Sequence, residues 1–212
     1  SPNEKLRLLF GGLNIINSKV EGENLEIKNS KSEDGVNFVN SKIKLNNINF
    51  DNIKSDAFDS DFSELQIKNI SCSNIGNDCL DLSFSKGQVD NLNAAFISDK
   101  VLSIGEKSTL NINKIKATKS EIGVVAKDSS ILNVNFYFHE EIKVPLAAYV
   151  KKEELGPPRI NIINLNPILK NLEFISKDSN VIIQSNRING FRSSESIKKM
   201  FYGNDYGAKT QR

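Results

Sequence analysis

Asparagine recurs at a fixed interval of 22 residues through the middle of this 212-residue chain. The members of this asparagine column are Asn47, Asn69, Asn91, Asn113 and Asn135. A period in this range is the signature of a repeat architecture, in which each repeat stacks on the one before it. Residues one period apart therefore lie one above another, and a column in the sequence becomes a row of side chains in space.

Acidic and apolar residues follow nearly the same period. The acidic residues stand at intervals of 22, 22, 21 and 22: Asp34, Asp56, Asp78, Asp99 and Glu121. Four apolar columns accompany them: Val36, Phe58, Leu80 and Val101; Leu45, Ile67 and Val89; Ile48, Ile70 and Leu92; Ile53, Ile75 and Ile97. Within each repeat apolar residues alternate with polar ones, which is the periodicity of a strand and not of a helix.

Short alternating strands broken by Asn, Asp, Gly and Ser predict an all-β fold, a parallel β-helix of about nine coils. Helical solenoids need longer repeats, and the leucine signature of leucine-rich repeats is missing. Each strand would pair with its counterpart one coil along, roughly 4.8 Å away. The asparagine column then fits the coil corners, because Asn tolerates left-handed backbone and stacked Asn side chains can hydrogen-bond as a ladder.

The regular pattern ends in a different C-terminal part. Residues 151–158 are charged and contain Pro and Gly, which predicts a protruding loop, and strand-like segments resume at 159–165 and 180–186. A short helix is expected over 194–201, with Ser193 or Ser194 as its N-cap. Because an open solenoid end needs a cap, we predict a β-helix over residues 1–192 and a cap helix with a tail over 193–212.

Composition excludes two classes of function. The 28 basic and 26 acidic residues are mixed along the chain, so it lacks the basic stripe of a nucleic-acid-binding protein. No apolar run approaches the length of a membrane span. The sequence starts at Ser1-Pro2 without an initiator Met, and we expect an N-terminal region of the same protein, with any export signal, to precede it.

Aspartates from three adjacent coils form the sharpest candidate site: Asp56, Asp59, Asp61, Asp78, Asp81 and Asp99. Asp59 and Asp81 share a column, and like charges that close raise one pKa, which can create a general acid beside a general base. Asp59, Asp61 and Asp81 could instead hold Ca²⁺, which takes several oxygen ligands. In the third interpretation all six aspartates are turn and capping residues on a solvated face, and nearby lysines balance their negative charge.

Lysines and one glutamate complete the candidate binding residues: Lys100, Glu106 and Lys107. Lys100 or Lys107 could serve as the base of a lyase. A row of Glu64, Lys86 and Lys107 reads more simply as ion pairing between coils, as does a pair of Glu106 with Lys127.

Cysteine, histidine and tyrosine add little chemistry. The columns of Cys72 and Cys79 both face inward, which predicts two buried free thiols and no disulfide. His139 is the only histidine, which excludes a metal site built on several imidazoles. The tyrosines are too scattered along the sequence to predict an aromatic platform for sugar stacking.

Several motifs of the chain form a characteristic set: Ser32-Glu-Asp-Gly, Ser55-Asp-Ala-Phe-Asp-Ser-Asp-Phe-Ser63, Gly76-Asn-Asp-Cys-Leu-Asp-Leu-Ser83 and the terminal Phe201-Tyr-Gly. Together they resemble right-handed parallel β-helix domains of bacterial proteins that accompany spore-coat-kinase-type (CotH-like) modules. The resemblance implies no assigned activity. At the level of fold alone it extends to pectate lyases, polygalacturonases, alginate epimerases and phage tailspikes.

These observations predict a non-catalytic structural or glycan-interaction module, part of an exported or surface-associated bacterial protein. Its expected partner is a polysaccharide or another cell-envelope component, with no cofactor unless Ca²⁺ binds. The alternative is a polysaccharide lyase, hydrolase or epimerase that works at Asp59 and Asp81. A third prediction is a tailspike-type segment, which would be a trimer.

Overall fold

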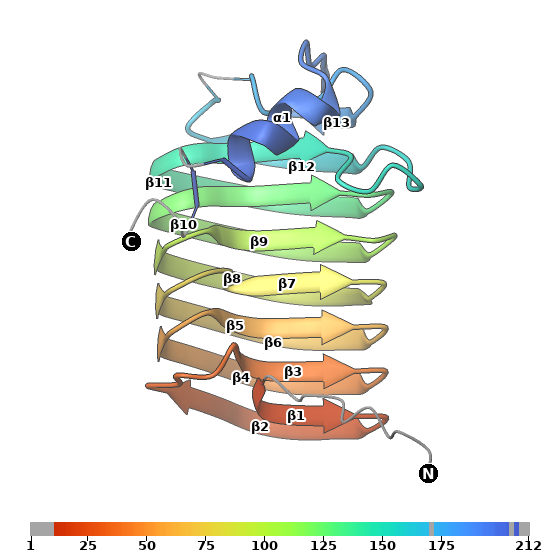
Figure 1. Cartoon of the computed structure of the whole chain (residues 1–212). Helices are drawn as coiled ribbons and strands as arrows, with labels where there is room; N and C mark the ends of the chain where they lie inside the picture. The colour runs from red at the N-terminus through yellow and green to blue at the C-terminus, as the bar shows by residue number, and fades with distance from the viewer. Residues whose placement is uncertain (1–10, 170–171, 204–205, 208–212) are drawn as a thin grey trace.

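The chain folds into a parallel β-solenoid of about eight turns (Figure 1). The computed structural model describes residues 11–169, 172–203 and 206–207. Its elements are β1 (Gly11–Ile16), β2 (Lys19–Lys28), β3 (Asp34–Val39), β4 (Lys42–Ile53), β5 (Asp56–Asp61), β6 (Glu64–Ile75), β7 (Leu80–Ser83), β8 (Lys86–Ile97), β9 (Lys100–Gly105), β10 (Thr109–Lys127), β11 (Ile131–Tyr149), β12 (Arg159–Asn166), β13 (Asn180–Ile183), β14 (Asn186–Ile188) and α1 (Ser194–Phe201).

Short and long strands occupy different sides of the solenoid. Strands β1, β3, β5, β7 and β9 stack on one side, and β2, β4, β6 and β8 stack on the other, all in parallel register. Strands β10 and β11 are each 19 residues long and run through both sides. After β12 the chain folds into an antiparallel β13–β14 hairpin in place of a further coil, so the number of turns is slightly below the predicted nine.

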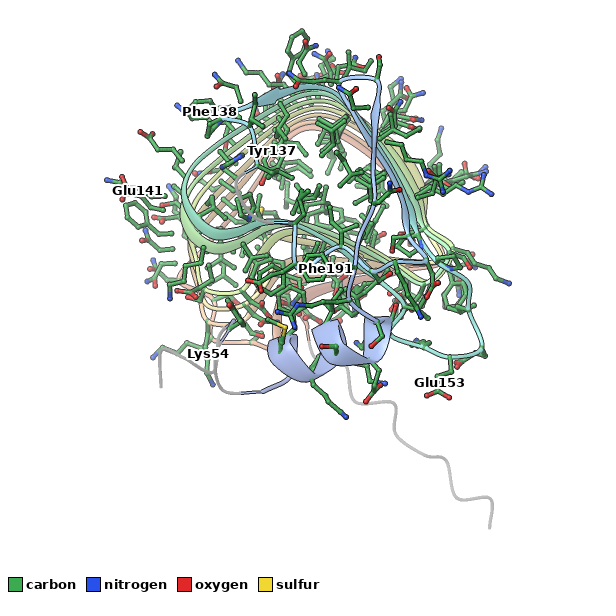
Figure 2. The ribbon with its side chains drawn as sticks, turned by 90° about the horizontal axis from the view of Figure 1, so that it is seen from above. Lys54, Tyr137, Phe138, Glu141, Glu153 and Phe191 are labelled. Carbon is green, nitrogen blue, oxygen red and sulfur yellow. A yellow bond between two sulfur atoms is a disulfide. The ribbon has the colours of Figure 1, made fainter. Side chains whose placement is uncertain are left out.

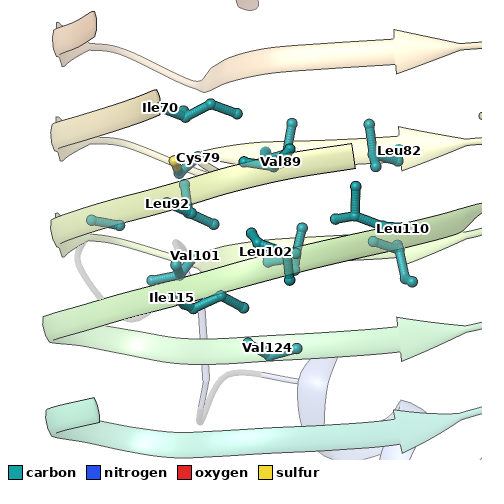
Figure 3. Packing of buried hydrophobic residues seen from close by; sticks show 14 of the residues in the cluster. Ile70, Cys79, Leu82, Val89, Leu92, Val101, Leu102, Leu110, Ile115 and Val124 are labelled. Carbon is teal, nitrogen blue, oxygen red and sulfur yellow. The ribbon is translucent and has the colours of Figure 1, made fainter. Parts of the chain in front are cut away.

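The strand register confirms the apolar columns of the long strands. Ile48 pairs with Ile70 and Ile70 with Leu92, as the period predicts. Figure 3 shows Ile70, Leu92 and Ile115 one above another inside the coils. Stacking of like positions in successive coils thus produces one continuous core, and each coil contacts only its neighbours.

The acidic column departs from the prediction at one step. Leu80 pairs with Leu102 and not with Val101, so the counterpart of Asp78 is Lys100, whose backbone N–H donates to Asp78 Oδ1 at 2.9 Å. Asp99 lies one residue earlier. The apolar residues decide this register, because a slip of one position would turn Leu102 out of the core.

The predicted asparagine ladder is confirmed. Asn69 Nδ2 donates to Asn47 Oδ1 at 2.9 Å, and Asn91 Nδ2 donates to Asn69 Oδ1 at 2.9 Å. The same bond joins Asn135 to Asn113 at 3.0 Å. Asn69 thus acts as donor to one coil and acceptor to the next. Among the described residues no such bond joins Asn113 to Asn91, so the ladder consists of two separate parts.

The prediction of a left-handed backbone for the asparagine column is wrong, since none of its five members has a positive φ. Asn47 lies inside β4, where the alternation breaks and Asn46 and Asn47 both avoid the core, so the strand bends there. Left-handed backbone occurs at the strand ends instead, where φ is 48° to 57° at a different set of asparagines: Asn17, Asn29, Asn40, Asn52 and Asn74. Asn does favour that geometry, but the period alone does not distinguish the two kinds of bend.

The two cysteines form a disulfide, which corrects the prediction of free thiols. The Cα atoms of Cys72 and Cys79 are 6.0 Å apart. Both side chains face the core as predicted, and Cys72 is in register with Phe50 and Ala94. Cys72 is near the end of β6 and Cys79 immediately precedes β7, so the two inward columns converge at the turn between the two sides of one coil. Column analysis gives the direction of each side chain but not the distance between columns.

The C-terminal helix is confirmed, and it lies on the side of the solenoid. Ser193 is the N-cap, and its side chain accepts a hydrogen bond from the backbone N–H of Ser196. Seen from above, α1 lies outside the ring of coils (Figure 2). Its buried residues Ile197 and Phe201 pack against outward-facing residues of β10 and β11. The end of the core is instead contacted by Leu169, Leu172 and Ile188.

Residues 151–158 form the predicted loop, which connects β11 to β12 and protrudes from the stack at the right of Figure 1. In the part of the chain that the structure describes, no helix has the length and apolar character that crossing a membrane requires. The predicted tail beyond α1 falls largely on residues 204–205 and 208–212, which lie outside the described residues.

Candidate functional site

The candidate residues lie on one outer face of the solenoid, formed by β3, β5, β7, β9 and the C-terminal halves of β10 and β11. Its outward side chains form three columns across the strands. The edge column is Asp34, Asp56, Asp78, Lys100, Ile122 and Val144. The central column is Asn37, Asp59, Asp81, Ser103, Val125 and Ala147. The third column is Val39, Asp61, Ser83, Gly105, Lys127 and Tyr149.

The chemistry of this face changes along the solenoid axis. The coils of β3, β5 and β7 present aspartates, and the coil of β9 presents Lys100. The coil of β10 presents Lys127 beside apolar residues, and the coil of β11 presents Val144, Ala147 and Tyr149. Val125, Ala147 and Tyr149 are fully buried although they point away from the core, because α1 covers them. The helix therefore ends next to the charged part of the face.

Carboxylates of the edge column are bound to the backbone of the next coil. Asp56 Oδ1 accepts hydrogen bonds from Asn77 Nδ2 at 2.6 Å and from the backbone N–H of Asp78 at 2.8 Å. Asp78 Oδ1 accepts from the backbone N–H of Lys100. Burial raises the pKa of Asp56 to about 6, against the lowering effect of these bonds. These aspartates act as acceptors at strand starts, which matches the capping interpretation.

Lys100 is held between two carboxylates. Its ammonium lies 2.7 Å from Asp99 Oδ2 and 3.3 Å from Asp78 Oδ1, and the residue is 8% exposed. Burial alone would lower the pKa of Lys100, but the charges of Asp78 and Asp99 outweigh it and raise the pKa. A lysine held as a cation in this way is unsuited to the role of a lyase base that the sequence suggested.

Carboxylates of the neighbouring positions have no such partners. Asp59 and Asp81 are in register on β5 and β7, as predicted. Among the described residues, the side chains of Asp59, Asp61 and Asp81 form no hydrogen bond or ion pair. Burial raises the pKa of Asp59 to about 8, and the charges of Asp61 and Asp81 add to the effect. Asp59 is therefore mostly protonated at neutral pH, beside two further carboxyl groups.

Calcium binding at Asp59, Asp61 and Asp81 stays a prediction. Within the described ranges, no three or more His, Cys, Asp or Glu side chains are grouped closely enough to hold a metal ion. Ca²⁺ takes six to eight oxygen ligands, and three carboxylates would provide only part of that shell.

A pocket of about 590 Å³ opens where the edge column meets the C-terminal segment. Of the predicted residues, it is lined by Asp78, Asp81, Asp99 and Lys100. The remaining predicted residues are not part of its lining: Asp56, Asp59, Asp61, Glu106 and Lys107. The predicted catalytic pair is thus divided, with Asp81 lining the pocket and Asp59 beyond its boundary.

Aromatic rings form the other wall of the pocket, contrary to the expectation from their scattered positions in the sequence. Phe201, Tyr202 and Tyr206 line it together. The ring centroid of Phe201 is 5.2 Å from that of Phe174 and 5.9 Å from that of Tyr206. Packing of α1 on the apolar end of the outer face brings these rings to the pocket. The apolar residues at the outward positions of β10 and β11 were the sequence signal for such a cover.

Lys127 was missed as a pocket residue. Its predicted partner Glu106 instead pairs with Lys152, whose Nζ is 2.8 Å from Glu106 Oε1, and accepts a hydrogen bond from Ser83 Oγ. Lys127 Nζ donates to Ser103 Oγ at 2.9 Å. Burial alone would lower the pKa of Lys127, but the charge of Asp81 acts in the opposite direction, and the net effect is a raised pKa. Lys127 is therefore a cation at neutral pH.

Lys107 does not belong to the predicted row of ion pairs. Glu64 pairs with Lys86 at 2.9 Å, but the register places Thr109 beside Lys86. Lys107 lies in the turn before β10, with φ 61°, and is exposed. The turns before β6 and β8 each contain one left-handed residue, Phe62 and Phe84, whereas the turn before β10 contains two, Glu106 and Lys107. The extra residue moves Lys107 out of register with Lys86.

Comparison with known proteins returns no relative. No protein-family model matches the chain, and no curated protein or solved structure is significantly similar to it. The resemblance to domains that accompany CotH-like modules therefore stays a prediction. What is established is a parallel β-solenoid of about eight turns, with a charged pocket beside its C-terminal helix.

Proposed function

We propose that this chain is a non-catalytic glycan-binding module that presents the pocket on a rigid solenoid. The observation that carries the proposal is the composition of the pocket wall. Phe201, Tyr202 and Tyr206 stand on one side, and Asn77 and Asp81 supply hydrogen-bonding groups on the other. Sugar rings pack their C–H faces on aromatic rings and bond their hydroxyls to carboxylates and amides, so both walls suit a saccharide.

The engaged charges of the pocket favour binding over catalysis. Lys100 is locked between Asp78 and Asp99, and Asp78 also accepts a backbone hydrogen bond. A general acid or base must exchange protons with a substrate during the reaction. Groups that are fixed in the fold as ion pairs are poorly suited to transfer protons, which leaves binding by the other pocket residues as the better-supported role.

The disulfide supports an exported location. Structural disulfides persist in oxidising compartments and are rare in the cytosol of most organisms. Cys72–Cys79 is buried in the core and spans the corner between β6 and β7 within one coil. A secreted or surface-exposed solenoid would meet cell-envelope or environmental polysaccharides, which we propose as its partners.

Binding to a panel of immobilised polysaccharides, with parallel detection of released sugars, tests this function. The proposal expects retention on one or more polysaccharides without product. Tyr202→Ala should weaken that binding about tenfold, since it removes a ring from the pocket wall. Phe136→Ala is the matched control, because Phe136 is an exposed ring on β11 away from this pocket. No retention on any polysaccharide, or equal weakening by both variants, would count against glycan binding here.

A polysaccharide-active enzyme is the second candidate, and the Asp59–Asp81 pair is the observation that favours it. The pKa of Asp59 near 8 keeps a proton available at neutral pH, next to a second carboxyl group. Glycoside cleavage uses such a pair, one group to protonate the leaving oxygen and the other as base or nucleophile.

Product formation distinguishes the enzyme from the binding module. The enzyme candidate expects released or rearranged sugars, lost in both Asp59→Asn and Asp81→Asn. Asp90→Asn, an exposed aspartate on β8 on the opposite side, should keep full activity. If the unmodified protein binds a polysaccharide and yields no product from it, the enzyme candidate is removed.

A further inference from the structure

The ammonium of Lys127 is buried without a carboxylate partner. The residue is 5% exposed, and the bond to Ser103 Oγ is the hydrogen bond that its Nζ makes. Among the described residues, no carboxylate lies within ion-pair distance of it, in contrast to Lys100 with its two. A buried charge is costly unless it is paired and fully hydrogen-bonded. The fold thus holds a cation that it does not neutralise by direct contact.

The direction of the side chain places this cation in the pocket. The stem of Lys127 lies over Gly105, where a Cβ would be 3.5 Å from Lys127 Cε. The ammonium therefore reaches back one coil to Ser103, which is in register with Asp81 on the next coil. Lys127 is part of the pocket lining.

Two further lysines without ion pairs line the same pocket. Lys54 and Lys151 form no salt bridge with the described residues, and the ammonium of Lys151 lies 5.3 Å from the ring centroid of Tyr202. Figure 2 shows Lys54 on the same side of the solenoid as α1. The carboxylates of Asp78 and Asp99 are already satisfied by Lys100. Glu33 and Asp81 also line the pocket and form no ion pair with the described residues. Three of the four lining lysines are therefore without an ion pair, against two of the four lining carboxylates.

We infer that the pocket binds its saccharide through an oxyanion, a carboxylate or phosphate group on the sugar, that accepts a hydrogen bond from Lys127 Nζ. The inference rests on the proposed glycan-binding function and names its ligand class. The oxyanion supplies the partner that the buried ammonium lacks. The sugar ring then contacts Tyr202, and its hydroxyls reach the side chain of Asn77.

A purely structural role for Lys127 makes the opposite prediction about stability. In that case the ammonium serves to balance Asp81, whose charge acts on it at longer range, and Lys127→Met should lower the melting temperature. If the ammonium is kept for a ligand, Lys127→Met should leave the melting temperature unchanged or raise it, because an apolar side chain of similar length replaces a lone buried charge.

Calorimetric titration of the full chain with four probes tests the inference. The probes are a trisaccharide of hexuronic acid, its carboxyl-reduced neutral counterpart, glucose 6-phosphate and inorganic phosphate. We expect the acidic trisaccharide, glucose 6-phosphate or both to bind at least about tenfold tighter than the neutral trisaccharide, as one charge-assisted bond warrants. Lys127→Met should abolish that preference. Lys116→Met, at an exposed lysine on the same strand, should retain it.

Each of the other possible results of the titration overturns one stated part of the inference. Equal affinity for the acidic and neutral trisaccharides overturns the oxyanion and leaves glycan binding standing. Binding of inorganic phosphate without any sugar overturns the saccharide as ligand. Absence of binding for all four probes overturns the inference, and the polysaccharide panel then decides on glycan binding separately. A preference that survives in Lys127→Met, or a lower melting temperature with unchanged binding, assigns Lys127 to the structure alone.

Discussion

Two groups of aspartates on the same outer face differ in what their carboxylates contact. In the edge column, Asp56 and Asp78 accept backbone hydrogen bonds from the next coil, and Asp78 also pairs with Lys100. Asp59 and Asp81, in the central column, have no hydrogen-bond or ion-pair partner among the described residues. Residues of one type in adjacent coils thus have two kinds of environment, which the contact partners distinguish and the sequence pattern does not.

The difference shows which carboxylates a ligand could use. A carboxylate that completes the hydrogen bonds of a strand start is needed by the folded chain in every condition. A carboxylate without a partner raises the free energy of the folded state through burial and repulsion, so its presence is better explained by a role outside the fold. Asp81 belongs to this second group and lines the pocket.

The largest expected effect separates the two columns directly. Asp78→Ala leaves the buried ammonium of Lys100 with one carboxylate fewer and its backbone N–H without an acceptor. We expect a loss of about 3–5 kcal/mol in the free energy of unfolding. Asp81→Ala, the matched change in the central column, should change the free energy of unfolding by about 1 kcal/mol or less, with either sign. Urea denaturation measures both, and equal losses would show that the two columns do not differ.

Asp56→Ala should lower the free energy of unfolding by a smaller amount, about 1–3 kcal/mol. It leaves the two donors Asn77 Nδ2 and the backbone N–H of Asp78 unpaired, but it removes no partner of a buried ammonium. Asp56→Asn should restore part of this stability, since an amide oxygen can still accept from the backbone N–H of Asp78. Thermal unfolding of both variants provides the measurement. If Asn is no better than Ala, the charge of Asp56 and not its hydrogen bonds is what the fold requires.

The pH dependence of stability tests the central column. The pKa of Asp59 is raised to about 8 in the folded chain, against about 3.9 in an unfolded one. Between these values the folded state keeps a proton that the unfolded state releases, so the free energy of unfolding falls as pH rises from about 4 to 8. Asp59→Asn should reduce this fall. Denaturation at a series of pH values, with Asp90→Asn as control, checks it, and an unchanged slope in Asp59→Asn would contradict the assignment.

The smallest expected effect concerns a column with no charge. Asn69 donates to Asn47 and accepts from Asn91, so Asn69→Ala should cost about 1 kcal/mol. Asn93→Ala, at an exposed neighbouring position on β8, should change the free energy of unfolding less. If both variants lost the same free energy of unfolding, the hydrogen bonds of the asparagine ladder would not be a source of stability.

The coil and most of its register were predictable because one period governs the apolar residues. Ile48, Ile70 and Leu92 repeat without a gap, so their pairing follows directly. The step from Asp78 to Lys100 was not predictable from charge, since Asp99 is chemically closer to Asp78. Burial of Leu102 decides the register there, and burial depends on the whole coil.

The site was only partly predictable, because a pocket depends on contacts that no period describes. Asp81, Asp78, Asp99 and Lys100 were identified from adjacent coils. The contribution of Tyr202 depends on where α1 packs, which is a tertiary property of the chain. The disulfide was missed for a similar reason, since the distance across a coil is not encoded in the spacing between coils.

The central claim is that the ligand binds between Lys127 and the C-terminal rings, while the edge column serves the fold. Backbone amide shifts in NMR spectra, followed during titration with an acidic trisaccharide, test it most directly. We predict shifts confined to β7, β9, the C-terminal half of β10 and the end of α1, with Asp81, Lys127 and Tyr202 among the largest. Shifts centred on the asparagine ladder of β4, β6 and β8, or no shifts at all, would contradict it.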